Sequence, residues 1–134
     1  TNSKRDVKEP GDLKGLKMRT MENPVHIAAY KGFGIITTPM AFPEVFTALQ
    51  QGTVDGQENP YNTILSSKFY EVQKYLTVTN HVYSPWIVLV SKKYWDGLSK
   101  AEQKVLLDAA KKSRDFERQD TRAEADKALA DLKG

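Results

Sequence analysis

The spacing of hydrophobic residues changes several times along this chain, which predicts short strands alternating with helices. Residues 17–21 alternate as in a short strand, and residues 35–38 are rich in β-branched side chains. Between them, Asn23 and Pro24 supply a helix cap and a first-turn proline, and Gly34 fits the position just past the end of that helix. Strands that alternate with helices predict an α/β layer arrangement.

Two further helices are predicted in the middle of the chain. One opens at Pro43 and ends at Gly52, and the other follows Asn59–Pro60 and covers residues 61–72. The second has the clearest amphipathic spacing in the chain. The positions expected to be buried in the two helices are Val45, Phe46, Leu49, Tyr61, Ile64, Leu65, Phe69 and Val72.

The last third of the chain predicts strands at 76–79 and 86–90, the second apolar enough to be buried on both faces. Ser99 and Glu102 have the spacing of a capping box, which opens a long final helix. Apolar residues are sparse on that helix, so we expect it to lie across another part of the protein. The expected organisation is a poorly ordered segment at 1–10, an α/β lobe at 11–98 and a long helix at 99–134.

Composition narrows the class of protein. A chain of 134 residues is long enough for one globular core. No stretch approaches the about 20 apolar residues of a membrane span, and the polar start lacks the apolar run of a secretory signal. Cysteine is absent, which excludes disulfides and thiolate chemistry. The 20 basic and 17 acidic residues are interspersed, so a nucleic-acid surface is not favoured.

The sequence offers little for catalysis, so we expect neither an enzyme nor a cofactor. The two histidines, His26 and His81, have no spacing that defines a metal or nucleophile site. There is no Gly-x-Ser-x-Gly motif, and the glycines at 32 and 34 end a helix instead of linking a strand to a helix. We expect no metal site either.

A more informative stretch runs from Arg19 to Asn59, where strand and turn ends bring Arg19, Phe42 and Asn59 beside helix starts. Ligands of α/β proteins bind at such edges. An arginine there holds a carboxylate in a planar two-pronged contact. Simpler roles remain open: a surface ion pair for Arg19, a hydrophobic staple for Phe42 and a helix cap for Asn59.

Three motifs resemble those of one family: residues 15–24 (GLKMRTMENP), 38–52 (TPMAFPEVFTALQQG) and 54–60 (VDGQENP). Together they resemble the second lobe of TRAP transporter solute-binding proteins of the DctP type. The resemblance covers about residues 8 to 125 and includes the final helix. It implies a single lobe of a periplasmic-binding-protein-like fold with a small mixed sheet, and a first lobe that is absent from this chain.

The resemblance also implies functional roles. Arg19 corresponds to the arginine that clamps an organic-acid carboxylate, Asn59 to an asparagine that hydrogen-bonds it, and Phe42 to an aromatic residue of the pocket. Met40 and Gln57 are added because they are adjacent to these positions. The expected function is partial: a solute-binding protein of a periplasmic organic-acid uptake system, dicarboxylate-like, that delivers its ligand to TRAP membrane transporter subunits.

A second hypothesis is a truncated remnant that self-associates and has lost ligand binding. Residues 86–90 and the thin apolar stripe of the final helix are expected to be exposed without a first lobe. The sequence therefore predicts a homodimer built on these two segments.

Overall fold

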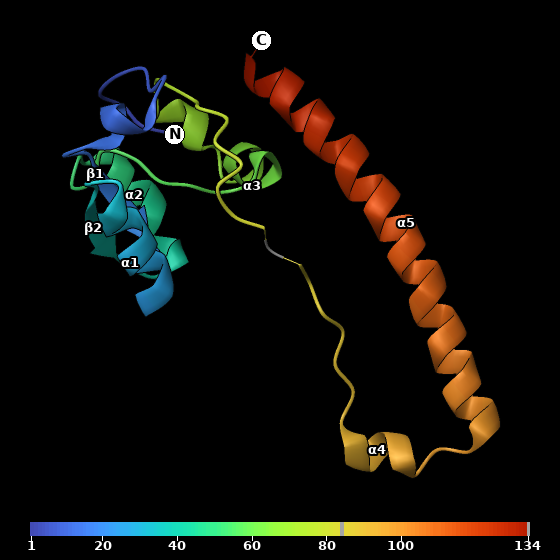
Figure 1. Cartoon of the computed structure of the whole chain (residues 1–134). Helices are drawn as coiled ribbons and strands as arrows, with labels where there is room; N and C mark the ends of the chain where they lie inside the picture. Colours follow the sequence, from blue (N-terminus) through green and yellow to red (C-terminus); the bar gives the residue numbers. More distant parts are fainter. Residues whose placement is uncertain (84, 134) are drawn as a thin grey trace. The chain divides into compact units, whose positions relative to one another are not determined.

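The computed structural model describes residues 1–83 and 85–133. It divides into two compact units. Unit 1 consists of Thr1–Thr79 together with Ala128–Gly134, and unit 2 is Asn80–Lys127. The two units are described separately below (Figure 1). This division differs from the expected boundary at residue 99, because the first part of the final helix belongs to unit 2 and its end belongs to unit 1.

The sheet of unit 1 has two parallel strands, β1 (Lys17–Thr20) and β2 (Ile36–Pro39). Helix α1 (Pro24–Gly32) connects them, as expected for a parallel pair. The Asn23 side chain caps α1 by accepting from the main-chain N–H groups of Val25 and His26. Past the helix, Gly34 has a φ of +74°, which a residue with a side chain rarely adopts. The strands and the helix boundaries predicted here are confirmed to within about one residue.

Short helical elements cover the rest of unit 1. They are η1 (Pro10–Leu13), η2 (Phe42–Glu44), α2 (Val45–Gln50), α3 (Tyr61–Ser66) and η3 (Phe69–Glu71). The prediction of one helix over 61–72 is wrong. The chain leaves α3 at Ser67, and Lys68 adopts a left-handed conformation with φ 54°. This break turns Phe69 into the core, where it is 1% exposed.

Two clusters form the core of unit 1. The helical cluster consists of Val45, Ala48, Leu49, Val54, Ile64 and Phe69, with Phe46 and Leu132 packed against it. The strand cluster consists of Val7, Leu16, Met18, Tyr30 and Ile35. Leu132 comes from the last turns of the final helix, so the end of that helix contributes to the core of unit 1. These clusters confirm an α/β fold with a small sheet.

The first residues of the chain are part of unit 1. Asn2 forms antiparallel bridges with Gly56 and Tyr75, and its side chain is buried. Val7 belongs to the strand cluster. We expected residues 1–10 to be poorly ordered, and this expectation differs from the structure. The segment is polar, but its main-chain groups form hydrogen bonds with residues that are distant in sequence.

Unit 2 contains helix α4 (Lys92–Asp96) and most of helix α5 (Lys100–Lys133). The capping box is confirmed, since Ser99 N–H donates to the Glu102 carboxylate at 2.8 Å and Glu102 N–H donates to Ser99 Oγ at 3.3 Å. The helix was expected to reach residue 134, which lies outside the described residues. None of the described helices combines the length and apolar character that a membrane span needs.

The strands predicted at 76–79 and 86–90 are not formed in the described residues. Tyr75 makes an isolated bridge, and residues 76–83 and 85–90 belong to no strand. A strand needs a neighbour to accept and donate its main-chain hydrogen bonds, and residues 86–90 make no main-chain hydrogen bond to another described residue. Local propensity alone is therefore not sufficient here.

Candidate functional site

The candidate site is built on the end of β1. Arg19 lies in this strand opposite Thr38 of β2, and its main-chain N–H donates to the carbonyl of Gly56 at 2.9 Å. Strand β1 thus has β2 on one side and the segment that begins at Gly56 on the other. This arrangement brings the three motifs of the sequence together, although Arg19 and Asn59 are 40 positions apart in the chain. Arg19 is only 4% exposed.

The Arg19 guanidinium is held by its neighbours on one edge. Its Nε and Nη2 atoms donate to the carbonyl of Met40 at 3.2 and 3.0 Å. The Phe42 ring centre lies 5.9 Å from the guanidinium carbon, within range of a cation–π contact. Met40 was selected from sequence only by adjacency, and its main-chain oxygen, not its side chain, orients the arginine. The structure therefore brings Arg19, Met40 and Phe42 into direct contact.

The electrostatic setting of Arg19 is unusual. Among the ion pairs of the described residues, none joins a carboxylate to Arg19. Burial lowers the pKa of Arg19, and the charges of Glu58 and Glu22 partly offset this effect. An arginine nevertheless stays protonated in proteins. A buried positive charge without a bonded counter-ion is costly, so this position favours the arrival of an anion.

Gln57 and Asn59 form a second group of the site. The Gln57 side chain is fully buried, donates to Thr1 Oγ1 at 2.8 Å and accepts from Asn59 Nδ2 at 2.7 Å. Asn59 does not cap α3, because that helix has Pro60 at its cap position and no side-chain cap bond. Gln57 thus fixes the orientation of the Asn59 amide. The bond from Arg19 to Gly56 connects this group to the arginine.

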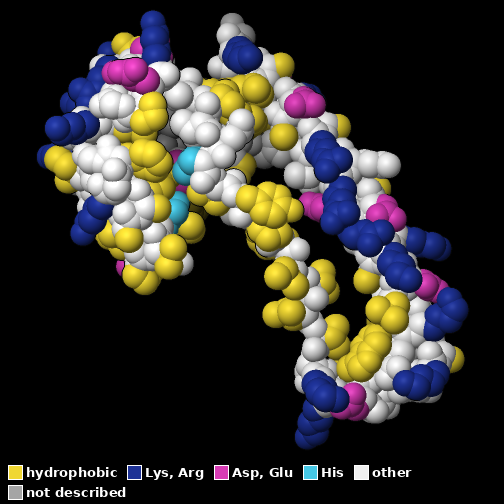
Figure 2. Space-filling model, viewed as in Figure 1, with side chains coloured by type: hydrophobic (Ala, Val, Ile, Leu, Met, Phe, Trp, Pro, Cys, Tyr) yellow, Lys and Arg dark blue, Asp and Glu magenta, His cyan; other side chains and the backbone are white. Residues whose placement is uncertain are grey.

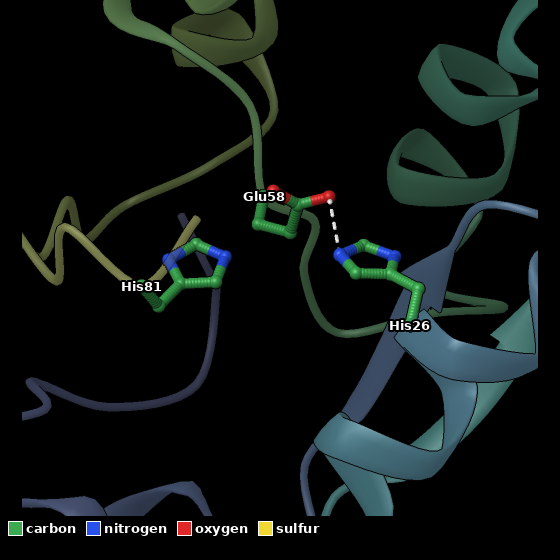
Figure 3. A group of neighbouring side chains, drawn as sticks. All are labelled: His26, Glu58 and His81. Carbon is green, nitrogen blue, oxygen red and sulfur yellow. Dashed lines mark ion pairs between the residues drawn. The ribbon is translucent and has the colours of Figure 1, made fainter. Parts of the chain in front are cut away.

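Glu58 lies between two candidate residues, Gln57 and Asn59, but was not itself a candidate from the sequence. One carboxylate oxygen of Glu58 lies 3.5 Å from His26 Nε2, and both side chains are largely buried (Figure 3). The ring of His26 also contacts Tyr30 edge-on, with centroids 4.7 Å apart. His81, which the same figure draws, belongs to unit 2. An acidic residue inside the 54–60 motif was the available signal.

Comparison with known proteins places the chain in a family. The sequence model described as "Bacterial extracellular solute-binding protein, family 7" (DctP) matches residues 1–134. A solute-binding protein of Verminephrobacter eiseniae is 64% identical over 99% of this chain and 40% of its own length. The 2,3-diketo-L-gulonate-binding periplasmic protein YiaO of Escherichia coli is 48% identical over 88% of this chain and 36% of its own length.

Solved structures agree with the sequence matches. A TRAP periplasmic solute-binding protein from Polaromonas, bound to D-erythronate, superposes with a TM-score of 0.86 at 54% identity. The superposition covers 99% of this chain and 44% of that protein. The chain therefore spans about two fifths of the length of the relatives that it matches. Because the family model matches residues 1–134, the chain belongs to family 7 of the bacterial extracellular solute-binding proteins.

Proposed function

We propose that this chain supplies the carboxylate-binding part of a TRAP-type solute-binding protein for organic acids. The observation that carries the proposal is the buried Arg19 guanidinium, which makes no ion pair with a carboxylate of the described residues. A ligand carboxylate would supply the missing negative charge. The names of two relatives, which refer to diketo-L-gulonate and D-erythronate, support a small organic acid as ligand.

The bonding of Arg19 also suggests how the ligand would approach. Met40 occupies the edge formed by Nε and Nη2. The edge formed by Nη1 and Nη2 is left for a parallel pair of hydrogen bonds to a carboxylate. Phe42 would restrain the plane of the guanidinium from one face. The Asn59 amide, which is held by Gln57, would donate a further hydrogen bond to the ligand or accept one from it.

The proposed role is binding and delivery, not chemical conversion. Family membership supports a location in the periplasm and TRAP membrane subunits as the receiving partner. A single charge-assisted arginine contact contributes on the order of 1.5–3 kcal/mol. Even a 1 mM dissociation constant requires about 4 kcal/mol. We therefore expect the 134-residue chain on its own to bind an organic acid weakly, at millimolar concentration or above.

Weak binding of this kind is best tested by nuclear magnetic resonance titration of the ¹⁵N-labelled chain. We expect D-erythronate to shift the amide signals around β1 and around residues 56–59, and the uncharged polyol erythritol to leave them unchanged. Arg19→Lys keeps the charge but removes the planar two-pronged contact, and it should weaken binding several-fold. Arg114→Lys, an exposed position in α5, is the matched control.

Two results would contradict the proposal. One is a titration in which Arg19→Lys and wild type respond equally to D-erythronate. The other is a response to erythritol as large as the response to D-erythronate, because this would show that the carboxylate is not recognised. A folded spectrum of the Arg19→Lys variant is required for either conclusion.

A further inference from the structure

A surface of unit 1 outside the candidate site combines exposed apolar and basic side chains. Phe33 follows α1 and Ile36 begins β2, and their side chains are 45% and 52% exposed. Ile36 lies opposite Lys17 in the parallel pair, so these two side chains are on the same face of the sheet. Figure 2 shows that both basic and hydrophobic side chains reach the surface of unit 1.

Hydrogen bonds hold together the segments that carry these side chains. Gly15 N–H donates to the carbonyl of Gly34, and Gly34 N–H donates to the carbonyl of Lys31, both at 2.9 Å. The Arg5 guanidinium donates to the carbonyl of Lys14 at 2.6 Å. Residue 5 and the segments 14–17 and 31–36 are therefore neighbours where the two strands begin. The amino-end patch is defined as Arg5, Lys14, Lys17, Lys31, Phe33 and Ile36.

The basic side chains of the amino-end patch have no partner of opposite charge. All four are exposed, and none makes an ion pair with a carboxylate of the described residues. Asp12 and Asp55 are bonded to the same segments, but their carboxylates accept hydrogen bonds from main-chain N–H groups. Four basic side chains thus outnumber two acidic ones, and the patch attracts anions.

The size and composition of the amino-end patch fit a lipid surface better than a protein. A stable protein interface buries about 800 Å² on each partner, and two half-exposed apolar side chains supply only a small part of that area. A bilayer requires no matching shape. Its affinity for a protein adds the insertion of apolar side chains to the attraction of basic side chains for anionic headgroups. The patch offers both contributions.

We propose that the amino-end patch attaches unit 1 to the surface of a bilayer that contains anionic phospholipids. Phe33 and Ile36 enter the boundary between headgroups and acyl chains, while the basic side chains lie among the headgroup phosphates. Arg19 is near the other end of β1, and Met40 follows the end of β2. Attachment therefore uses none of the candidate ligand residues and leaves them open to a ligand.

The test is sedimentation of the 134-residue chain with lipid vesicles. Vesicles of phosphatidylcholine and phosphatidylglycerol in equal parts are compared with vesicles of phosphatidylcholine alone. We expect binding to the anionic vesicles to be at least tenfold stronger at low ionic strength and to weaken with added salt. A nitroxide-labelled lipid should broaden the amide signals of residues 14–17 and 31–36 more than those of α5.

The apolar contribution is tested by the double variant Phe33→Ala, Ile36→Thr, which keeps a β-branched residue at the start of β2. We expect it to weaken binding to the anionic vesicles at least threefold. Phe116→Ala, Val105→Thr is the matched control, since both residues are exposed apolar positions of α5. It should change binding less than twofold.

The basic contribution is tested by Lys14→Gln, Lys31→Gln, which should weaken binding to the anionic vesicles at least fivefold. Lys111→Gln, Lys112→Gln makes the same change of charge at exposed positions of α5 and should change binding less than twofold. Each variant is compared with wild type only if its ¹⁵N spectrum shows a folded unit 1. The nitroxide measurement on the wild-type chain tests the location of the contact without any substitution.

Four outcomes would overturn the proposal. The first is equal binding to neutral and anionic vesicles, or binding to neither. The second is a loss of binding in a control variant as large as in the corresponding patch variant. The third is displacement from the vesicles by soluble glycerol phosphate at the same phosphate concentration, because this would indicate a site for a free phosphate. The fourth is a dimer of the free chain that Phe33→Ala, Ile36→Thr abolishes, which would assign the patch to a second copy.

Discussion

Unit 1 and unit 2 both contain segments of strand-forming residues, but only those of unit 1 form a sheet. In unit 1, strand-forming residues pair because β1 lies between β2 and the segment at Gly56, and two clusters of buried side chains support the sheet. In unit 2, an apolar run of even higher strand propensity remains without a ladder. Helix α5 forms nonetheless, because the main-chain hydrogen bonds of a helix join residues that are close in sequence. Helices need only local contacts, whereas strands need a neighbour.

The two units also differ in the roles that we propose for them. The candidate ligand residues all lie in unit 1, where contacts between residues far apart in sequence hold Arg19 and Gln57 in buried positions. Unit 2 carries exposed apolar residues such as Trp86 and Phe116 and has no core cluster of its own among the described residues. The binding site that we propose therefore lies in unit 1, whereas unit 2 exposes apolar side chains.

The largest expected effect comes from removing a buried phenyl ring from unit 1, and the matched substitution in unit 2 should have little effect. Phe69→Ala removes a side chain that is 1% exposed from the helical cluster. We expect it to lower the free energy of unfolding of unit 1 by about 3–5 kcal/mol, because the contacts are lost and a cavity remains. Urea unfolding followed by near-ultraviolet circular dichroism of the tyrosines measures this change.

Phe116→Ala is the matched substitution in unit 2, where the ring is 69% exposed. We expect a change within about 0.5 kcal/mol, as for other surface positions. Similar losses for the two variants would show that α5 is supported by contacts comparable to those of the helical cluster. The contrast between the units would then be wrong.

A second pair of substitutions tests how closely the main chain is packed at the site. A Cβ atom at Gly56 would lie 2.8 Å from Met18 Sδ and 2.9 Å from Asn2 Cβ, whereas one at Gly97 would meet no atom closer than 3.5 Å. We expect Gly56→Ala to cost about 1–3 kcal/mol from overpacking. Gly97→Ala in unit 2 should be neutral or slightly stabilising. Equal thermal midpoints for the two variants would contradict this expectation.

A smaller effect is expected where a glycine is required by backbone conformation. Gly34 ends α1 with a φ of +74°, and a Cβ there would also lie 3.1 Å from the Lys14 side chain. We expect Gly34→Ala to destabilise unit 1 by about 1 kcal/mol, while Gly34→Asn should cost less because asparagine tolerates this conformation. Urea midpoints of the two variants, compared with wild type, measure the difference. A midpoint that is lower for asparagine than for alanine would refute the explanation.

Much of unit 1 could be predicted from sequence, because its boundaries are set by local chemistry. Asn23 and Pro24 mark the start of α1, Gly34 its end, and Ser99 with Glu102 the start of α5. Arg19 and Phe42 were also candidates from the sequence, and the guanidinium carbon lies 5.9 Å from the ring centre; their role in ligand binding stays a prediction. The break at Lys68 could not be predicted, because burial of Phe69 in the helical cluster is a tertiary effect.

Other features of the site depended on contacts that no local pattern contains. The carbonyl of Met40 orients Arg19 through the main chain, and every residue type has such a carbonyl. Glu58 pairs with a histidine 32 positions earlier in the chain, and nothing near either residue indicates the other. Asn59 resembled a cap because Pro60 follows it, yet its amide bonds to Gln57. Sequence therefore predicts which residues are candidates better than it predicts what they contact.

The smallest expected effect concerns the start of α5, where unit 2 has its clearest local stabilisation. Hydrogen bonds from the Ser99 hydroxyl and main-chain N–H lower the pKa of Glu102 below its usual value of 4.5. The carboxylate form is favoured in the helix, so its contribution is fully present above pH 4.5 and is lost as the pH falls through the lowered pKa. Carbon-13 chemical shifts of residues 100–104 should show the first helical turn fraying at low pH. Glu102→Gln and Ser99→Ala should both reduce this pH dependence, and a pH dependence that persists in full in both variants would show that other carboxylates govern the start of the helix.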